Sequence, residues 1–287
     1  MAVYTCRSCK YSQETLWEGV CPQCRGFYRG VKVGTDTKEQ KNRSTFAAAA
    51  TSTTVHIPTG IAGFDRVLSG GLVAGDVILF GGFRGAGKST LLVQVADSFS
   101  AKRKTMYCSS EQSAEGVVQI AHRAGARNEG VVVLGNQKTI EDTLAIVKEE
   151  RVFLTIFDSL QKFTSNQSGG SPGSASQGSA VASAIKEHCR TRDACAIVVN
   201  QMSRAGELKG GTDVEHDLDC IAVLAFPDDK DDDVPDEKDV RLLVVDKNRN
   251  GSENLRSFWI MTSGGAMEEV SKRSKIIDIG RGKYKRD

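Results

Sequence analysis

The stretch that most constrains this chain is residues 82–89, Gly-Phe-Arg-Gly-Ala-Gly-Lys-Ser, which fits the spacing G-x-x-x-x-G-K-[ST] without a gap or substitution. A β-branched and aromatic run at 76–80 precedes it and predicts a buried strand. Apolar residues recur at helical spacing from Leu91 to Phe99, directly after it. Strand, turn and helix in this order are the context in which the octet binds phosphate, whereas a purely structural turn needs neither the lysine nor the serine. We therefore interpret residues 82–89 as a P-loop.

Each residue type in the octet has a physical role in binding ATP and Mg²⁺. The glycines allow backbone N–H groups to surround the β- and γ-phosphates, and the start of the following helix favours their negative charge. Lys88 would place its positive charge on the same phosphates, and the Ser89 hydroxyl is the expected Mg²⁺ ligand. The residues predicted to hold the nucleotide are Gly82, Phe83, Arg84, Gly85, Ala86, Gly87, Lys88, Ser89 and Thr90.

Two carboxylates follow predicted strands. The apolar run at 152–157 ends in Asp158, which is the Walker B arrangement, in which the carboxylate holds hydrated Mg²⁺ opposite Ser89. A shorter strand at 105–108 is followed by Glu111, and a carboxylate there can face the γ-phosphate and activate the attacking water. On sequence alone, a glutamate at a strand end is more often just a solvated side chain.

The predicted strands alternate with helices, which indicates an α/β fold with a mainly parallel central sheet. A further buried strand is expected at 194–199, and it ends just before Gln201. Residues 164–179 are rich in Ser, Gly and Gln without apolar periodicity, so we expect a long loop there that is not part of the core. A second glycine-rich loop follows Gln201 and holds Arg204 and Lys209. Both loops follow strand ends and should lie on the same face of the sheet.

The first 24 residues contain two Cys-x-x-Cys pairs separated by eleven residues, a spacing that can place four thiolates around Zn²⁺. The predicted ligands are Cys6, Cys9, Cys21 and Cys24. Metal binding would supply most of the folding free energy of so short a segment. Two disulfides are the alternative, although these are rare in a reducing cytoplasm. The expected domains are a zinc ribbon at 1–30, a flexible linker at 31–55, a RecA-like ATPase core at 56–270 and a basic tail at 271–287.

Composition narrows the remaining possibilities. The net charge of +2 argues neither for nor against nucleic-acid binding. The sequence contains no run of about 18 apolar residues, so we expect no membrane span. The N-terminus lacks a signal-peptide pattern, so we expect a cytoplasmic protein. An acidic stretch at 228–239 is expected to be a solvated hairpin tip, and the basic tail can either contact phosphate backbones or raise solubility. The other cysteines are expected in the core: Cys108, Cys189, Cys195 and Cys220.

Several further motifs are similar to those of one family. Residues 57–61 read Ile-Pro-Thr-Gly-Ile, and residues 172–177 resemble a PGSxSQ loop. Residues 247–251 are similar to a KNRFG signature, with Asn250 in place of the aromatic residue. Together with the cysteine pairs and the P-loop, these motifs make residues 5–270 resemble the RadA (Sms) family, which are bacterial RecA-family ATPases of DNA recombination and repair.

The resemblance implies a RecA-type core assembled into a hexameric ring, with ATP between protomers. It implies that Glu111 activates the attacking water, that Gln201 senses the γ-phosphate, and that the two loops line the ring channel and contact single-stranded DNA. Lys247 and Arg249 would reach the neighbour's γ-phosphate, where added cations stabilise the transition state. The Lon-protease-like domain of the family is not expected in this chain, so no proteolytic activity is inferred.

The sequence therefore predicts a DNA-dependent ATPase that moves on single-stranded DNA, with helicase or branch-migration activity in recombination, repair or replication. Two other classes of function stay open. A KaiC-like signalling ATPase would work through phosphorylation or partner binding, and the cysteine pairs and the KNRxG run count against it. An ATP-dependent loader or scaffold would bind DNA without unwinding it, with the zinc ribbon recruiting a recombinase or replication partner.

Overall fold

The computed structural model describes residues 3–5, 11–13, 21–24, 31–33, 54–203, 212–228, 234–235 and 237–270. The chain divides into two compact units, Met1–Thr53 and Thr54–Asp287. The predicted basic tail at 271–287 and the loop residues Arg204 and Lys209 lie outside the described residues.

The first unit contains a small antiparallel sheet in the order β2-β1-β3. Its strands are β1 (Val3–Thr5), β2 (Ser12–Gln13) and β3 (Val31–Val33). The predicted linker starts at residue 31, but β3 pairs with β1, so residues 31–33 belong to this sheet instead. The β-branched Val31 and Val33 on either side of Lys32 favour a strand. Cys21 is buried and is followed by a turn that ends at the exposed Cys24. Cys6 and Cys9 lie outside the described residues.

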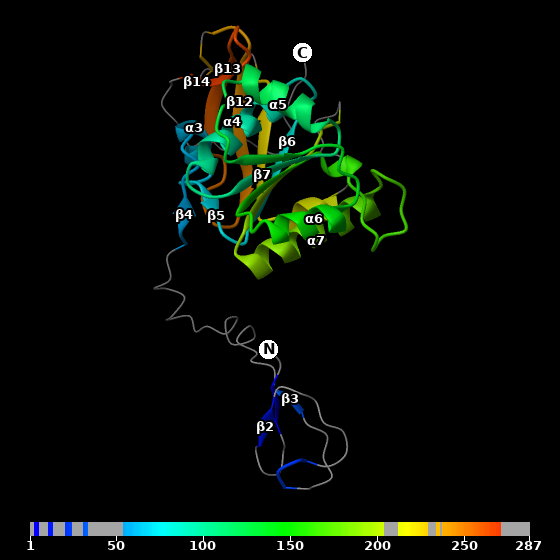
Figure 1. Ribbon diagram of the computed structural model, residues 1–287. Helices are drawn as coiled ribbons and strands as arrows, with labels where there is room; N and C mark the ends of the chain where they lie inside the picture. Colours follow the sequence, from blue (N-terminus) through cyan, green and yellow to red (C-terminus); the bar gives the residue numbers. More distant parts are fainter. Residues whose placement is uncertain are drawn as a thin grey trace. The chain divides into compact units, whose positions relative to one another are not determined.

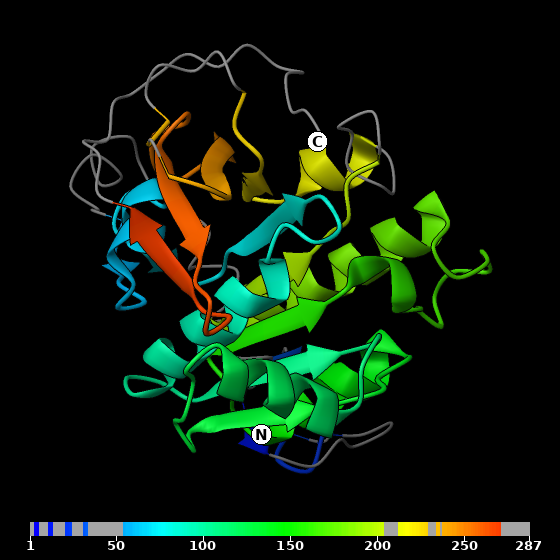
Figure 2. The ribbon, with the colours of Figure 1, turned by 90° about the horizontal axis from the view of Figure 1, so that it is seen from above.

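The second unit is built on a nine-stranded sheet with the order β14-β13-β12-β11-β6-β10-β9-β7-β8 (Figures 1 and 2). The strands from β11 to β8 are parallel and the pairs β11–β12, β12–β13 and β13–β14 are antiparallel, so the predicted α/β fold with a mainly parallel sheet is confirmed. The strands are β6 (Val77–Gly82), β7 (Thr105–Ser109), β8 (Val131–Leu134), β9 (Leu154–Asp158), β10 (Cys195–Val199), β11 (Cys220–Ala225), β12 (Val240–Asn248), β13 (Arg256–Met261) and β14 (Met267–Val270).

Helices cover both faces of this sheet (Figure 1). On one face lie α3 (Ala62–Val67), α4 (Lys88–Ser100) and α5 (Ala114–Arg123). On the other lie α6 (Ile140–Glu149), α7 (Ala175–Arg192) and α8 (Thr212–Asp217), and η1 (Leu160–Lys162) is a short 3-10 turn after β9. A two-stranded ribbon of β4 (His56–Ile57) and β5 (Leu72–Val73) precedes β6. Within the described ranges, no helix has the length and apolar character needed to cross a membrane.

The core has two layers because successive residues of a strand point to opposite faces. In β6, Ile78 and Phe80 pack with α3, α4 and α5, whereas Val77 and Leu79 pack toward α6 and α7. All six residues of β6 are buried, as expected of a strand with neighbours on both sides and helices above and below. The four cysteines predicted to be core residues are all buried: Cys108, Cys189, Cys195 and Cys220.

The loop expected at 164–179 is shorter than predicted, and part of it is core. Helix α7 begins at Ala175, and Gln177 and Ser165 are buried. The Ser174 hydroxyl caps this helix by accepting a hydrogen bond from the Gln177 N–H. The prediction was wrong here because Ser, Gly and Gln conceal a helix start from an analysis based on apolar spacing.

The acidic stretch at 228–239 connects β11 to β12, which are antiparallel neighbours with Leu224 opposite Leu243. The predicted hairpin is therefore present. Residues 229–233 and 236 of its tip lie outside the described residues.

Candidate nucleotide-binding site

The predicted P-loop joins the carboxyl end of β6 to the start of α4 (Figure 1). Gly87 is the N-cap of α4 and has φ 97°, a left-handed conformation that favours glycine. A Cβ atom at Gly87 would also lie 3.1 Å from both the Met261 Cε and the Met267 Sδ atoms. The backbone can therefore turn tightly into the helix only with glycine here, which leaves the N–H groups of the first helical turn available for an anion.

Lys88 lies at the start of α4 with only 9% of its surface exposed. Its Nζ atom donates hydrogen bonds to the carbonyl oxygens of Gly82 at 2.8 Å and Phe83 at 2.9 Å. Burial lowers the pKa of Lys88, and the nearby carboxylates of Asp158 and Glu111 act in the opposite direction. The ammonium group is thus held at the loop by backbone oxygens, with two acidic side chains close to it.

A pocket of about 310 Å³ opens at this loop. Phe83 and Ala86 do not line it, because their side chains are buried in the two core layers. The size and the charged lining suit a polyphosphate better than an apolar ligand. The lining residues are Arg84, Gly85, Gly87, Lys88, Ser89, Thr90, Glu111, Ile120, Arg123, Asp158, Val199, Gln201 and Met261.

Asp158 ends β9, next to the P-loop helix. Its Oδ2 atom accepts hydrogen bonds from the Ser89 Oγ at 2.7 Å and from the Tyr107 hydroxyl at 2.6 Å. Burial raises the pKa of Asp158, and the hydrogen bonds from Tyr107 and Ser89 act against this. The Ser89 and Asp158 oxygens are adjacent and are the hard donors that Mg²⁺ prefers, so the residues present fit that ion.

Glu111 follows β7 and is exposed, but its carboxylate is held by two other strand ends. Its Oε1 atom accepts hydrogen bonds from the Ser159 Oγ at 2.6 Å and from the Gln201 Nε2 at 3.3 Å. Since β7, β9 and β10 are neighbouring parallel strands, the sheet brings these three side chains together at one edge. Glu111 therefore lies in the same pocket as Lys88 and Asp158, at an exposed point where water can reach it.

Several residues of the site were not predicted from the sequence. Tyr107 is buried in β7, and burial, the largest cause, raises the pKa of its phenol well above the usual value, so the phenol stays protonated and donates to Asp158. Ile120 and Arg123 reach the pocket from α5, and Met261 reaches it from β13. The sequence offered one usable signal, because Tyr107 lies in the predicted strand that precedes Glu111.

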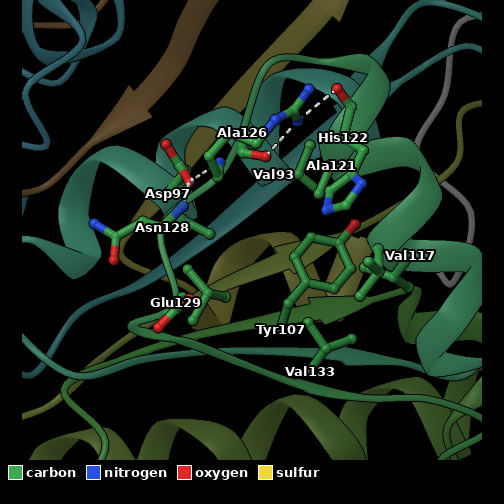
Figure 3. A pocket seen from close by; sticks show the side chains of 14 residues that line it. Val93, Asp97, Tyr107, Val117, Ala121, His122, Ala126, Asn128, Glu129 and Val133 are labelled. Atoms are coloured by element: carbon green, nitrogen blue, oxygen red, sulfur yellow. Dashed lines mark hydrogen bonds between the residues drawn. The ribbon is translucent and has the colours of Figure 1, made fainter.

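A second pocket, of about 200 Å³, lies behind Tyr107, between α4, α5, β7 and β8 (Figure 3). Its walls are mainly valine and alanine, with the Tyr107 ring among them. At its rim, the Asp97 Oδ1 accepts hydrogen bonds from the N–H groups of Arg127 at 2.7 Å and Asn128 at 2.6 Å. Unlike the pocket at the P-loop, its lining includes no lysine and no glycine.

Lys247 and Arg249 lie far from their own P-loop. Lys247 lies at the end of β12, and Arg249 directly follows this strand. Asn248 is opposite Cys220, and Cys220 in turn is opposite Ile78 near the start of β6. The P-loop follows Gly82, at the other end of β6. The Arg249 Nη1 lies 3.2 Å from the Asp219 Oδ1, and the Lys247 Nζ donates to the carbonyl oxygen of Glu215 at 2.8 Å. The structure thus separates these two cations from the other candidate site residues by the length of a strand.

Within the described parts of the chain, no three His, Cys, Asp or Glu side chains are grouped to hold a metal ion. Two of the four predicted zinc ligands lie outside those parts. The Ser89–Asp158 pair offers one hydroxyl and one carboxylate, a donor set that fits an ion shared with substrate phosphates.

Comparison with known proteins shows similarity to ATPases. The family model described as the KaiC ATPase matches residues 57–151, which include the P-loop and Glu111. The chain is 32% identical to the DNA repair protein RadA of Escherichia coli over 97% of its length, and 31% identical to that of Aquifex aeolicus over 96%. It spans 62% and 61% of the lengths of these relatives. A solved DnaB-like replicative helicase has the same fold, with a TM-score of 0.63 at 16% identity, over 85% of this chain and 68% of the other.

Proposed function

We propose that this chain is a DNA-dependent ATPase of repair or recombination. The premise is its homology to the bacterial RadA proteins and its RecA-like ATPase fold. Two observations support this. The similarity to RadA extends over 97% of the chain, and it is therefore not restricted to the P-loop that many unrelated ATPases share. The pocket at the P-loop also combines a lysine, a hydroxyl and two carboxylates in the arrangement that ATP hydrolysis needs.

In this proposal the residues of one chain bind ATP and prepare the attacking water. The backbone at 84–89 and Lys88 bind the phosphates, and Ser89 and Asp158 would hold Mg²⁺, which when bound neutralises charge on the phosphates. Glu111 orients a water molecule and accepts its proton, held in place by Ser159 and Gln201. Gln201, which lines the same pocket, would sense the γ-phosphate.

The observation that carries the oligomeric part of the proposal is the position of Lys247 and Arg249. They lie at the opposite edge of the sheet from their own P-loop, so within one chain they cannot contact its γ-phosphate. They would instead contact the γ-phosphate of ATP bound by a neighbouring copy. Hydrolysis would then occur at the subunit interfaces of a ring, which we take to be a hexamer. Such cations stabilise the charge that develops during phosphoryl transfer.

The proposed DNA-binding elements are the loop at 163–174, which follows β9 and η1, and the predicted glycine-rich loop after Gln201, whose residues 204–211 lie outside the described part of the chain. In a ring they would line the channel and grip single-stranded DNA, so that ATP hydrolysis drives translocation, unwinding or branch migration. A KaiC-like signalling ATPase is the second candidate, because the KaiC family model matches residues 57–151. A non-unwinding loader or scaffold is the third.

We also propose that the cysteine pairs bind Zn²⁺ and form a docking module for a recombination or replication partner. Thiolates at this spacing are typical zinc ligands, and the burial of Cys21 is compatible with such a site. A site closed by four thiolates has no position for substrate, so its role would be structural.

The experiment that tests the function measures ATP hydrolysis by the purified full chain with and without single-stranded DNA, together with strand displacement on forked and three-stranded substrates. We expect stimulation by DNA and displacement that is lost in Lys88→Ala. A hydrolysis rate indifferent to DNA, with no DNA binding at moderate salt, would contradict the proposal. Stimulation without displacement would favour the loader, and incorporation of the γ-phosphate into the protein would favour the signalling ATPase.

A further inference from the structure

We propose that Asp219 and Asp76 are positioning residues that fix the turn at 247–251 to the start of β6 and so hold Arg249 ready for the neighbouring subunit. The inference rests on the proposed function, because it assumes that Arg249 acts on ATP bound by another copy. It assigns a role to two buried or partly buried carboxylates that lie outside the nucleotide pocket. It also accounts for Asn250, which stands where the KNRFG signature has an aromatic residue.

Asp219 is anchored to the first residue of β6. Asp219 is only 5% exposed. Its N–H donates a hydrogen bond to the Val77 carbonyl oxygen at 3.2 Å, and its Oδ2 accepts one from the Val77 N–H at 3.2 Å. Arg249 is then attached to Asp219 twice, through its N–H to the Asp219 carbonyl oxygen at 3.0 Å and through Nη1 to Oδ1 at 3.2 Å. The backbone and the side chain of Arg249 are thus oriented by one residue of the sheet edge.

The charges around Asp219 allow Arg249 to act elsewhere without leaving a buried charge unpaired. The Lys186 Nζ, from α7, lies 3.4 Å from the same Oδ1 atom. The Lys186 side chain is 13% exposed and that of Arg249 is 47% exposed, so Lys186 is the inner partner and Arg249 the outer one. If the guanidinium shifts toward a phosphate, Lys186 still neutralises Asp219, which avoids the large cost of an isolated buried carboxylate.

Asp76 holds the other side of the turn. Its Oδ2 accepts a hydrogen bond from the Asn250 Nδ2 at 2.7 Å, and the Asn250 N–H donates to the Asn248 Oδ1 at 3.0 Å. The next residue, Gly251, packs so closely that a Cβ atom there would lie 2.3 Å from the Ser69 Oγ. An aromatic side chain could not make the bond to Asp76, so in this chain an amide replaces whatever contact the aromatic residue makes in the signature.

Both anchors lie at the amino end of β6, and the P-loop lies at its carboxyl end. The buried strand β6 therefore connects Arg249, which would act on the neighbour's ATP, with the P-loop, which would bind this subunit's own ATP. Packed strands transmit displacement rather than absorb it. Asp219 and Asp76 would thus fix Arg249 relative to the nucleotide bound by the same subunit.

Mixing experiments separate this role from a general structural one. Lys88→Ala subunits have no working P-loop but offer Arg249, whereas Arg249→Ala subunits have a working P-loop. We expect each alone to lose most ATP hydrolysis, with Arg249→Ala lowering it by about 10³-fold, and the mixture to recover activity. The double variant Lys88→Ala, Asp219→Asn is expected not to rescue Arg249→Ala. Asp219→Asn alone, mixed with Lys88→Ala, is expected to recover activity, because its own P-loop is intact.

Binding of a fluorescent ATP analogue and thermal unfolding are measured for every variant. Asp219→Asn should bind the analogue within about twofold of wild type. The matched control is a double variant that combines Lys88→Ala with Glu253→Gln, which removes an exposed charge just after the turn, and it should rescue as well as Lys88→Ala does. If Asp219→Asn fails to fold, Asn250→Ala replaces it in the same mixtures with the same expectation. Equal rescue with and without Asp219 or Asn250 would overturn the inference alone. No rescue by Lys88→Ala itself would overturn the shared-site proposal and the inference with it.

Discussion

Asp158 is a partly buried carboxylate whose Oδ2 accepts a hydrogen bond from Ser89. Burial raises its pKa, so the folded chain without nucleotide binds a proton on this group more tightly than the unfolded chain does. The ionised form is therefore less favourable in the folded state, and the hydrogen bonds from Tyr107 and Ser89 offset only part of that cost. Such a residue lowers stability while it prepares a metal site, as is common where function and folding compete.

The residue-scale prediction is that Asp158→Asn abolishes ATP hydrolysis yet stabilises the nucleotide-free protein at neutral pH. The wild-type cost is fully present above the raised pKa of the folded state and is lost as the pH falls to the usual value of 3.8. The stability advantage of the variant should therefore shrink as the pH is lowered. Chemical denaturation between about pH 4.5 and 8 measures it. Glu187→Gln, at an exposed position on α7, is the control and should change little. A variant less stable than wild type at pH 7 would contradict the argument.

Among individual residues, the sequence predicted Lys88 and Asp158 as charged groups at strand ends, because each belongs to a short local motif. It did not indicate Tyr107 as a partner of Asp158, since 51 residues separate the two and nothing local to either relates them. The positions of Ile120, Arg123 and Met261 were missed for the same reason: each reaches the pocket from an element whose placement depends on the whole sheet.

At the scale of elements, the loop before α7 depends on one side chain. The Gln177 Oε1 accepts from the Ser165 N–H at 2.7 Å, and its Nε2 donates to the carbonyl oxygens of Ser168 at 2.7 Å and Gly170 at 3.0 Å. Gln177 is itself fixed by the first turn of α7. A segment without apolar residues is thereby ordered from within the helix that follows it, and composition alone does not predict this.

We therefore predict that Gln177→Ala releases the loop at 165–174 while leaving the sheet folded. Four backbone groups would lose their partner: the Ser165 N–H and the carbonyl oxygens of Ser165, Ser168 and Gly170. Each loss costs about 1–3 kcal/mol where the group stays buried. Hydrogen exchange should accelerate in this loop and at the start of α7, but not in β6 or β10. Gln167→Ala, at an exposed position in the same loop, should leave the exchange unchanged. If Gln177→Ala lowered protection throughout the sheet, the loop would not be a separate element.

Strands and helices close to the P-loop were predicted well because their apolar periodicity is regular and their turns are marked by glycine. Two elements were not. The start of α7 is concealed by polar residues, and β3 was assigned to a linker because three residues are too few for periodicity to register. The strand β3 depends on pairing with β1, which is distant in sequence, and the start of α7 depends on the polar side chains of Ser174 and Gln177 rather than on apolar spacing.

At the scale of the whole molecule, the order of the strands is the main property that the sequence did not determine. Alternating strands and helices predicted a parallel sheet, but not that β6 lies between β11 and β10 or that three antiparallel strands follow β11. Because β12 runs antiparallel to β11, Lys247 and Arg249 lie toward the end of β6 that is opposite the P-loop.

The division of the chain into Met1–Thr53 and Thr54–Asp287 predicts that the two units unfold independently. If the cysteine pairs bind Zn²⁺, Cys21→Ser removes a buried ligand, and the first unit should lose its metal and its structure together, because so small a sheet has little apolar area. A chromogenic chelator would report zinc release, and the melting transition of the ATPase unit should stay within about 2 °C of wild type. Cys108→Ser, inside β7, is the reciprocal control: it should lower that transition while zinc is retained. Cooperative loss of both units in Cys21→Ser would mean that the ATPase core depends on the first unit for its stability.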